Sequence, residues 1–403
     1  MSSKLLQGSA PSRQVKPYAP WPHFQEDEIE AVANVLRSGN VNYWTGEESR
    51  QFEREFAEFA GCSYAVAVAN GSVALELALY ALGIGAGDEV IVTPRSFVAS
   101  ASSVVLRGAK PVFADVDPDS GNITASSIRA VITPRTKAVI AVHLGGWLCE
   151  MDEIHAVARE YGLKVIEDCA QAHGGTYRGR PAGSLGDVAA WSFCQDKIMT
   201  TGGEGGMLTT NDPEVWEKAW SYKDHGKSYD AVYHRRHPPG YRWLHESFGT
   251  NWRMTELQSA IGRVVLRKVP HWVQIRRRNA QVLTEGLSGV EGLRIPSPPA
   301  HIGHAYYRLY AYVRPDLLKP GWDRNRIMVA INQAGIPCTV GSCSEVYLEK
   351  CFERAHLQPS GRLPVAKQLG ETSLAFLVHP TLDEEHMQDT VAVVLKIMQM
   401  ACC

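Results

Sequence analysis

A chain of 403 residues is too long for one ordinary hydrophobic core, so we expect two domains. The 41 lysines and arginines nearly balance 43 aspartates and glutamates, and the net charge of −2 gives no reason to expect nucleic acid or an anionic membrane as a partner. The sequence contains no bilayer-length apolar run, no secretion signal and no CxxC pair among nine scattered cysteines, so we expect a cytoplasmic protein with reduced thiols.

The chain begins with a predicted extended arm and two helices. Residues 1–20 are polar and contain prolines, which favours an arm. Apolar residues at helical spacing predict helices over 27–37 and 49–60. The loop between them, NVNYWTG, carries two aromatic side chains that either face a ligand or cap the core. Trp44 and Thr45 are therefore candidate substrate contacts.

A strand, a small polar turn and a helix follow. The predicted strand covers 64–69, and Asn70-Gly71-Ser72 opens a helix over 73–82. Such a turn directs free backbone N–H groups at a phosphate. The signal is weak by itself, because every α/β protein contains such turns.

Strands and helices then alternate, which predicts an α/β fold with a mainly parallel sheet covered by helices on both faces. The predicted strands are 89–93, 110–115, 138–143 and 163–168, and the predicted helices are 97–107 and 151–161.

The most informative stretch runs from residue 165 to 207. Its first strand ends at Asp168, a second strand over 188–193 carries Ser192, and Lys197 precedes a glycine-rich turn over 202–206. Carboxyl ends of parallel strands form the ligand-binding edge of such sheets. An aspartate, a serine and a lysine at this edge suit pyridoxal phosphate, whose aldehyde forms a Schiff base with lysine and whose pyridine nitrogen is held protonated by a carboxylate.

The rest of the chain predicts an irregular loop and a second domain. Residues 224–249 are rich in His, Arg, Tyr and Pro and are too long for a simple connection, so they form either a functional loop or a partly disordered one. We expect an arm over 1–20, a large cofactor-binding domain over 21–268 and a smaller C-terminal α/β domain over 269–403 with a bridging helix. Further predicted elements are helices over 216–223, 251–264, 269–288, 323–334 and 382–400 and a strand over 306–313.

Six motifs in this order resemble the DegT/DnrJ/StrS family of sugar aminotransferases, which are fold-type I pyridoxal-phosphate enzymes. The likeness runs from about Asp27 to the last helix. The motifs are Asn70-Gly71-Ser72 with ALELAL, Gly87-Asp88-Glu89-Val90, Ser96-Phe97 with Ala99, Glu167 to Gly174 (EDCAQAHG), Ser192-Phe193 with Lys197 and Gly203-Glu204-Gly205-Gly206, and Gly249 to Met254 (GTNWRM).

The resemblance implies a role for each matching residue. Lys197 would form the Schiff base and shuttle the proton, and Asp168 would pair with the pyridinium nitrogen. Phe97 would stack on the cofactor ring, and Gln171 would lie near the ring hydroxyl. The phosphate would be held by Gly71, Ser72 and Ser192, and by Asn251 from the neighbouring subunit of a homodimer with shared active sites.

Substrate contacts are assigned less directly. Together with Trp44 and Thr45, we take His225 and Arg253 as candidates, and we expect no metal ligands. His173 and His225 touch either cofactor or substrate or are ordinary packed histidines.

The resemblance implies ping-pong transfer of an amino group from an amino acid, L-glutamate in this family, to a keto sugar. We expect a nucleotide-linked 4-keto-6-deoxy sugar in polysaccharide or amino-sugar biosynthesis. A keto-inositol or 3-keto-sugar aminotransferase and a non-catalytic regulatory member remain alternatives, and the sugar, its nucleotide and the aminated carbon stay open. The absence of GxGxxG argues against a dehydrogenase, and Lys197 argues against the related dehydratases.

Two stretches depart from the family pattern. The turn after Lys197 is one residue longer than in most members. The segment after Gly335-Ile336 reads PCTVGSCSEVY where many members carry a tyrosine–proline–leucine–histidine stretch. We therefore expect the sugar pocket to differ most from that of other members.

Overall fold

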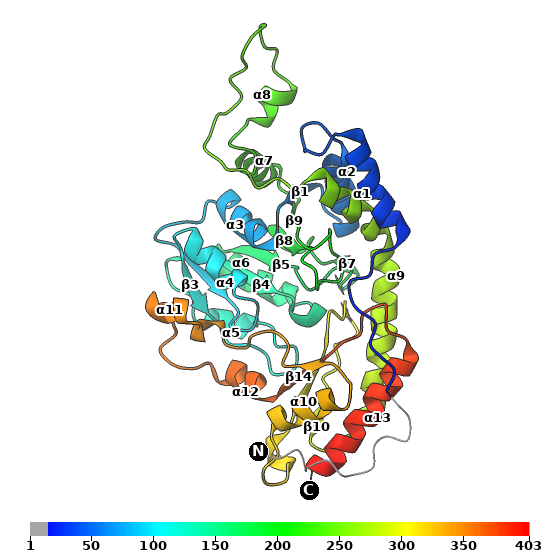
Figure 1. Cartoon of the computed structure of the whole chain (residues 1–403). Coiled ribbons are helices and arrows are strands. Elements are labelled where there is room, and N and C mark those ends of the chain that lie inside the picture. The colour runs from blue at the N-terminus through cyan, green and yellow to red at the C-terminus, as the bar shows by residue number, and fades with distance from the viewer. Residues whose placement is uncertain (1–14, 403) are drawn as a thin grey trace.

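The computed structural model describes residues 15–402 and contains a large and a small sheet, each covered by helices (Figure 1). The predicted α/β fold with a mainly parallel central sheet is confirmed. The domain boundaries at residues 20 and 268 stay a prediction.

The central sheet has seven strands in the order β1-β9-β8-β5-β4-β2-β3. Strand β9 is antiparallel to both of its neighbours, and the remaining pairs are parallel. The carboxyl ends of β4, β5 and β8 therefore lie at one edge of the sheet. The strands are β1 (Tyr64–Val68), β2 (Glu89–Val92), β3 (Lys110–Phe113), β4 (Thr136–Val142), β5 (Lys164–Asp168), β8 (Val188–Ser192) and β9 (Gly206–Thr210).

Helices bury both faces of this sheet, because successive strand residues point to opposite sides. In β1, Ala65 and Ala67 belong to one apolar core, whereas Val66 and Val68 belong to the other. The first core takes side chains from α2 (Glu48–Ala60), α5 (Ala125–Arg129) and α6 (Met151–Tyr161). The second takes them from α3 (Gly71–Ala81), α4 (Ala99–Leu106) and α7 (Pro213–Tyr222).

The small sheet is antiparallel, with the order β10-β12-β14-β13. Its strands are β10 (Leu293–Arg294), β12 (Leu309–Val313), β13 (Cys338–Thr339) and β14 (Ser373–Phe376). Near this sheet lie the helices α10 (Arg324–Gln333), α12 (Pro364–Thr372) and α13 (Glu384–Ala401) and a 3-10 turn at Pro315–Leu317. Helix α11 (Lys350–Arg354) and a 3-10 turn at Val346–Leu348 instead contribute to the second core of the large sheet. A third small sheet joins β6 (Thr176–Tyr177), β7 (Arg180–Pro181) and β11 (Ile302–Gly303), and a 3-10 turn at Leu144–Gly146 follows β4.

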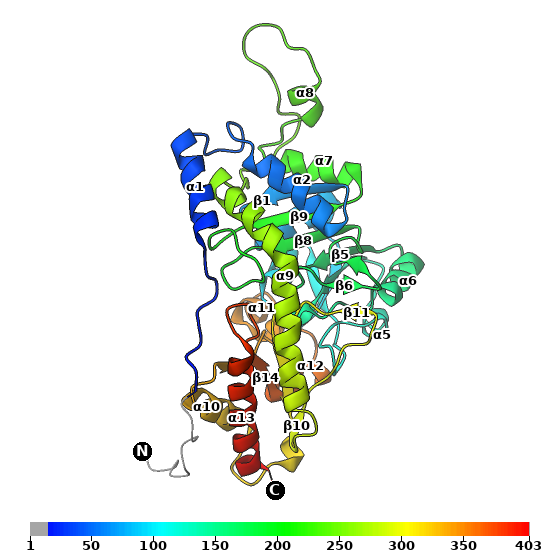
Figure 2. The ribbon, with the colours of Figure 1, turned by 90° about the vertical axis from the view of Figure 1, so that its right-hand side faces the viewer.

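One long helix, α9 (Glu256–Gly286), runs beside both sheets (Figure 2). Its 31 residues correspond to about 46 Å of helix. The two helices predicted over 251–264 and 269–288 are therefore wrong as separate elements. Pro270 lies inside the helix with an exposed ring, while Val269 and Val273 beside it are buried. This burial offsets the hydrogen bond that proline cannot donate.

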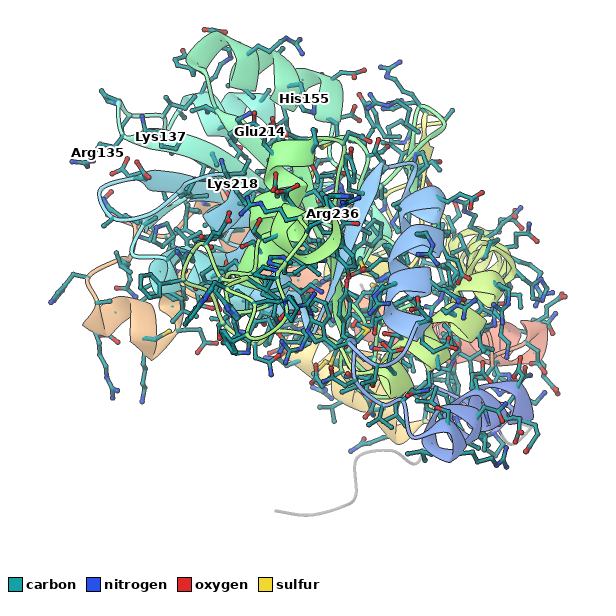
Figure 3. The ribbon with its side chains drawn as sticks, turned by 90° about the horizontal axis from the view of Figure 1, so that it is seen from above. Arg135, Lys137, His155, Glu214, Lys218 and Arg236 are labelled. Carbon is teal, nitrogen blue, oxygen red and sulfur yellow. The ribbon has the colours of Figure 1, made fainter. Side chains whose placement is uncertain are left out.

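Residues 224–249, called the arm from here on, project from the body of the molecule (Figure 1). Their one helix is α8 (Tyr229–Tyr233). Bridges between Asp224 and Asn251 and between Lys227 and His245 close the base. Seen from above, Arg236 of the arm and Glu214 and Lys218 of α7 carry their side chains on the outside of the molecule (Figure 3). The prediction of a long irregular segment is confirmed.

An extended segment over residues 15–24 connects the small sheet's side of the molecule to α1 (Glu26–Ser38), as Figure 2 shows. The Lys16 amide donates to Asp389 Oδ2 at 2.9 Å, and the Lys16 ammonium pairs with Glu385 at 3.2 Å and with Asp383. Residues 15–20 are extended. Residues 1–14 lie outside the described residues, so the N-terminal arm predicted over 1–20 stays a prediction. Between residues 15 and 402, no helix combines the length and apolarity that a bilayer crossing requires.

Candidate active site

A cavity of about 560 Å³ lies at the carboxyl ends of β5 and β8 and at the start of α3. This is the edge at which open α/β sheets bind ligands. Seven of the predicted site residues line it, although they are spread over more than 120 positions of the chain. They are Gly71, Ser72, Phe97, Asp168, Gln171, Ser192 and Lys197.

Asp168 ends β5 and is buried at the wall of the cavity. The Ser100 hydroxyl donates to its Oδ2 at 2.7 Å, and the Ala170 amide donates to Oδ1 at 3.2 Å. Burial raises the pKa of Asp168 above its usual value, and these hydrogen bonds and the charge of Lys197 oppose the rise. A carboxylate in this setting gains from a cationic N–H group, which a protonated ring nitrogen provides.

Lys197 follows β8 after a tight turn in which its amide donates to the Cys194 carbonyl at 3.0 Å. Its side chain is 17% exposed, and Nζ lies 3.2 Å from Asp196 Oδ1. Burial acts to lower the pKa of the amine, but Tyr307 and Asp196 outweigh it and raise that pKa. The amine therefore lies in the cavity and is an ammonium when it is not covalently bonded to a ligand.

The start of α3 forms a cradle with the end of β8. Asn70 caps the helix by accepting from the Val73 amide at 3.0 Å, while helix geometry gives the Gly71 and Ser72 amides no acceptor within the helix. A Cβ added at Gly71 would lie 2.6 Å from the Ser192 Cβ, so only glycine allows this approach. Free amides at a helix N-terminus next to serine hydroxyls bind phosphate well.

Phe97 and Gln171 complete the walls. The Phe97 ring is 67% exposed although it lines the cavity, so one face is available to a flat ligand. Gln171 Oε1 accepts from the Gly145 amide at 2.6 Å, and its Nε2 donates to Ser342 Oγ at 3.3 Å. Ser342 belongs to the segment after Gly335 that differs from the family pattern, so this segment contacts the cavity wall through Gln171.

These residues fit pyridoxal phosphate. The glycine cradle has the donors and the room for the phosphate, Asp168 is placed for the ring nitrogen, and Lys197 is the amine inside the cavity. Lys197, Asp168, Ser192, Gly71 and Ser72 would therefore hold the cofactor.

The family model of the DegT/DnrJ/EryC1/StrS aminotransferase family matches residues 22–395. The chain belongs to this family. The family depends on pyridoxal phosphate, and the protein is an aminotransferase.

Relatives of known name and structure agree with this membership. The chain is similar to the crystal structure of an aminotransferase from Psychrobacter cryohalolentis, with 58% identity, a TM-score of 0.94 and coverage of 95% of this chain and 99% of that one. It is 36% identical to the GDP-perosamine synthase of Caulobacter vibrioides, over 86% of this chain and 89% of the relative. It is 34% identical to the L-glutamine:2-deoxy-scyllo-inosose aminotransferase of Streptoalloteichus tenebrarius, over 95% of each chain.

In this aminotransferase, several predicted residues lie outside the Lys197 cavity, at the base of the arm. Arg253 Nη1 donates to Asp224 Oδ1 at 2.8 Å, and Asn251 is exposed beside it. His225 is exposed and has a φ of 61°, and the Trp44 ring lies 4.3 Å from the Lys227 ammonium. Their predicted roles, including that of Asn251 toward a neighbouring subunit, stay predictions.

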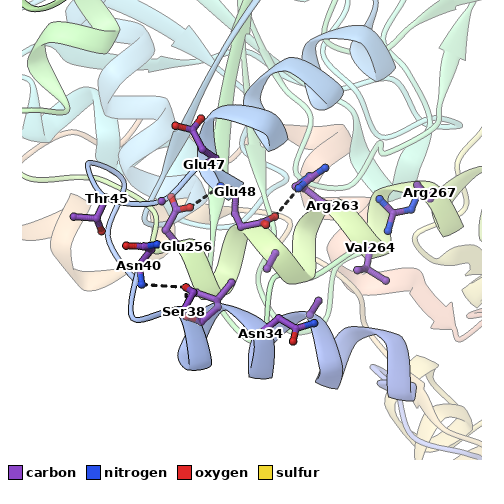
Figure 4. Close-up of a pocket in the computed structure, with 14 residues that line it drawn as sticks. Asn34, Ser38, Asn40, Thr45, Glu47, Glu48, Glu256, Arg263, Val264 and Arg267 are labelled. Carbon is purple, nitrogen blue, oxygen red and sulfur yellow. Dashed lines mark hydrogen bonds and ion pairs between the residues drawn. The ribbon is translucent and has the colours of Figure 1, made fainter.

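Thr45 lines a second cavity, of about 450 Å³, between α1, the start of α2 and α9 (Figure 4). The charged groups that line this second cavity form ion pairs and hydrogen bonds with one another. Arg263 pairs with Glu48 at 2.7 Å, and Glu256 Oε2 accepts from the Glu48 amide at 2.6 Å. The geometry gives Thr45 no contact with the Lys197 cavity within the single chain, and its role as a substrate contact stays a prediction.

Glu167, next to Asp168, has a structural role. It is fully buried and accepts from His143 Nε2 at 2.9 Å and from the backbone amides of residues 183, 185 and 186. Burial opposes its charge, but His143 and the amides outweigh burial and lower the pKa of Glu167. His143 Nδ1 accepts from the Cys149 amide at 3.1 Å. Both ring nitrogens of His143, which clusters with Glu167 and Cys169, are therefore already hydrogen-bonded.

His173 is a packed histidine rather than a cavity residue. Its ring contacts the rings of Trp191 and Phe193 at centroid distances of 5.2 and 5.7 Å. Burial, with the charges of Lys197 and Arg276, lowers the pKa of His173 to about 3. It is therefore neutral at physiological pH and supports the strand that carries Ser192.

Four further residues that contact Asp168 or Lys197, directly or through a neighbour, were not predicted from the sequence: Ser100, Asp196, Tyr307 and Trp21. Ser100 fixes Asp168, and the Tyr307 hydroxyl donates to Asp196. The Trp21 indole donates to the Lys197 carbonyl at 2.9 Å. Of these four residues, only Asp196 could have been identified from the sequence, because it is a charged residue directly before Lys197. The other contacts join residues far apart in the chain.

Proposed function

We propose that the protein transfers an amino group from L-glutamate to a nucleotide-linked 4-keto-6-deoxy sugar in amino-sugar or polysaccharide biosynthesis. The observation that carries the transferase chemistry is one cavity containing the Lys197 amine, the Asp168 carboxylate and the Gly71–Ser192 cradle. The nucleotide sugar is supported by the likeness to GDP-perosamine synthase.

Each residue has a definite task in this proposal. Bound pyridoxal phosphate supplies an aldehyde that takes the amino group and a protonated ring that accepts electrons from the substrate Cα–H bond. Asp168, as a buried carboxylate, holds the proton on the ring nitrogen. Lys197, as a neutral amine, would remove the proton from the substrate Cα and deliver it to the cofactor carbon that carries the nitrogen. The cradle at Gly71 and Ser192 fixes the phosphate and so sets the position of both reacting partners.

We further propose a homodimer in which the arm packs on a second copy of the chain. The arm exposes three large apolar side chains, Tyr241 at 74%, Trp243 at 84% and Phe248 at 98%. A patch of such rings on a projecting segment favours an interface. Asn251 lies at the base of the arm, where a second copy can bring it to a neighbouring cavity. Light scattering should give twice the mass of the chain, and Trp243→Ser should weaken the dimer.

We propose that the protein is located in the cytoplasm. The free thiols at Cys62, Cys149 and Cys169 support a reducing environment, because such thiols persist where disulfides do not form.

The first test is a visible absorption spectrum of the protein with pyridoxal phosphate before and after glutamate. We expect a band from cofactor attached to Lys197 and its loss when glutamate donates its nitrogen. Lys197→Ala should lose the band and all transfer while keeping its circular dichroism. Lys164→Ala, which removes an exposed lysine paired with Asp187, is the matched control. Normal turnover by Lys197→Ala would exclude the assignment.

A second candidate is an aminocyclitol aminotransferase, which the likeness to the 2-deoxy-scyllo-inosose enzyme favours. A panel of acceptors separates the two. The protein in its amino-loaded form is mixed with 4-keto and 3-keto nucleotide sugars and with a keto-inositol, and return of the original absorption band is followed. Fastest recovery with the keto-inositol would replace the nucleotide-sugar proposal.

A further inference from the structure

Asp196 makes two contacts that bear on Lys197. Its Oδ1 lies 3.2 Å from Lys197 Nζ, and its Oδ2 accepts from the Tyr307 hydroxyl. The Lys197 ammonium also lies 5.1 Å from the centroid of the Tyr307 ring. Tyr307 is buried and Asp196 is 49% exposed, so a rigid side chain from just before β12 fixes a carboxylate that otherwise faces solvent.

The main chain of Lys197 is fixed as well. The Trp21 indole donates to the Lys197 carbonyl at 2.9 Å, and Trp21 packs edge-on against Trp272 at 5.0 Å between ring centroids. With the backbone held on one side and the amine on the other, the lysine side chain has little freedom left.

Other charged and titratable groups near Lys197 do not duplicate Asp196. Asp168 is paired with Ser100, His173 is neutral, and Cys194 points its thiol toward Glu204 at 3.9 Å. Arg308, whose guanidinium carbon lies 5.0 Å from the centroid of the Tyr307 ring, adds positive charge. Asp196 is therefore the carboxylate within ion-pair distance of Lys197 among residues 15–402.

We propose that Asp196, fixed by Tyr307, is a positioning residue that holds the Lys197 amine whenever it is not bonded to the cofactor. The proposal rests on the proposed role of Lys197. During transfer the amine alternates between neutral and ammonium forms as it takes the proton from the substrate Cα and delivers it to the cofactor carbon. The carboxylate stabilises the ammonium form and keeps Nζ at the cavity wall, within reach of its next partner.

The inference is tested on the cofactor-free protein. Lys197 is labelled with an amine-reactive reagent at several pH values, and the labelled peptide is quantified by mass spectrometry. Asp196→Asn removes the negative charge, so the neutral and reactive amine should persist to lower pH. At a fixed pH near 8 we expect labelling to speed up by about three- to tenfold. Tyr307→Phe should shift labelling in the same direction by less, because it loosens Asp196 but keeps its charge.

Controls separate this role from a structural one. Asp152→Asn removes an exposed aspartate that pairs with Arg178 at 2.9 Å and should leave Lys197 labelling unchanged. Asp196→Glu should restore most of the wild-type pH profile. With the cofactor loaded, Asp196→Asn should also move the pH profile of the glutamate half-reaction to lower pH, which a general loss of stability does not do.

The two proposals fail separately. Unchanged or slower labelling in Asp196→Asn would overturn the role of Asp196. Failure of borohydride to trap pyridoxal phosphate on Lys197 in the wild-type protein would instead overturn the proposed function, and the labelling result would still decide whether Asp196 controls the amine.

Discussion

The close approach of α3 to β8 yields a quantitative prediction for Gly71→Ala. The added Cβ would lie 2.6 Å from Ser192 Cβ and 3.1 Å from its Oγ, well inside ordinary contact distance. The φ of Gly71 is not in the left-handed region, so alanine meets no backbone strain there. Alanine improves helix propensity by less than about 1 kcal/mol. Forcing an extra methyl into a packed site costs about 1–3 kcal/mol, so the steric effect is larger.

This cost falls on the cradle, because α3 and β8 must separate to accept the methyl group. We therefore expect pyridoxal phosphate to bind Gly71→Ala about 5- to 150-fold more weakly, the equivalent of 1–3 kcal/mol. The assay is titration of cofactor-free protein with pyridoxal phosphate, with thermal unfolding measured in parallel. Gly361→Ala, where an added Cβ meets nothing within 4 Å, is the matched control. Unchanged affinity together with an unchanged Tm would refute the reasoning.

Three further outcomes follow from the buried groups. Asp168→Asn should slow the glutamate half-reaction by weakening the hold on the ring proton, and stopped-flow absorbance measures the rate; an unchanged rate would place another residue in that role. Glu167→Gln should lower the free energy of unfolding by about 3 kcal/mol in urea at pH 7, because an amide N–H₂ would face backbone donors, and a change below 1 kcal/mol would contradict the hydrogen-bond pattern. The pKa of His173 is depressed to about 3 in the folded state, so His173 contributes stability above pH 6.5 that is lost as pH falls toward 3. His173→Phe should therefore flatten the fall of Tm between pH 6.5 and 4.5, and an equally steep fall would contradict it.

The strand ends and the Lys197 cavity were predictable because they depend on local patterns. An apolar run that stops at Asp168 and a strand that leads to Lys197 specify the same sheet edge, whatever the rest of the chain does. The Asn70-Gly71-Ser72 turn is equally local. These three segments, with Gln171 just beyond Asp168, hold six of the seven predicted residues that line the cavity, and Phe97 is the seventh.

Features that depend on distant partners were not predictable. Strand β9 pairs with β8, the preceding strand, and with β1, about 140 positions earlier, and no local pattern encodes the pairing with β1. Helix α9 continues through Pro270 because Val269 and Val273 beside it are buried in the first core of the large sheet. Tyr307 and Ser342 contact the cavity residues Asp196 and Gln171 from more than 100 positions away in the chain.

The position of Trp21 has a practical consequence for anyone who shortens this protein. The family match starts at residue 22, so a chain trimmed to the matched region would keep every family motif and lose the indole that bonds to the Lys197 carbonyl. It would also lose Lys16, which ties the segment to α13. Such a truncated protein could fold and bind cofactor yet hold its lysine loosely, and a weak activity measured on it would describe the missing N-terminal segment rather than the enzyme's preference for a substrate.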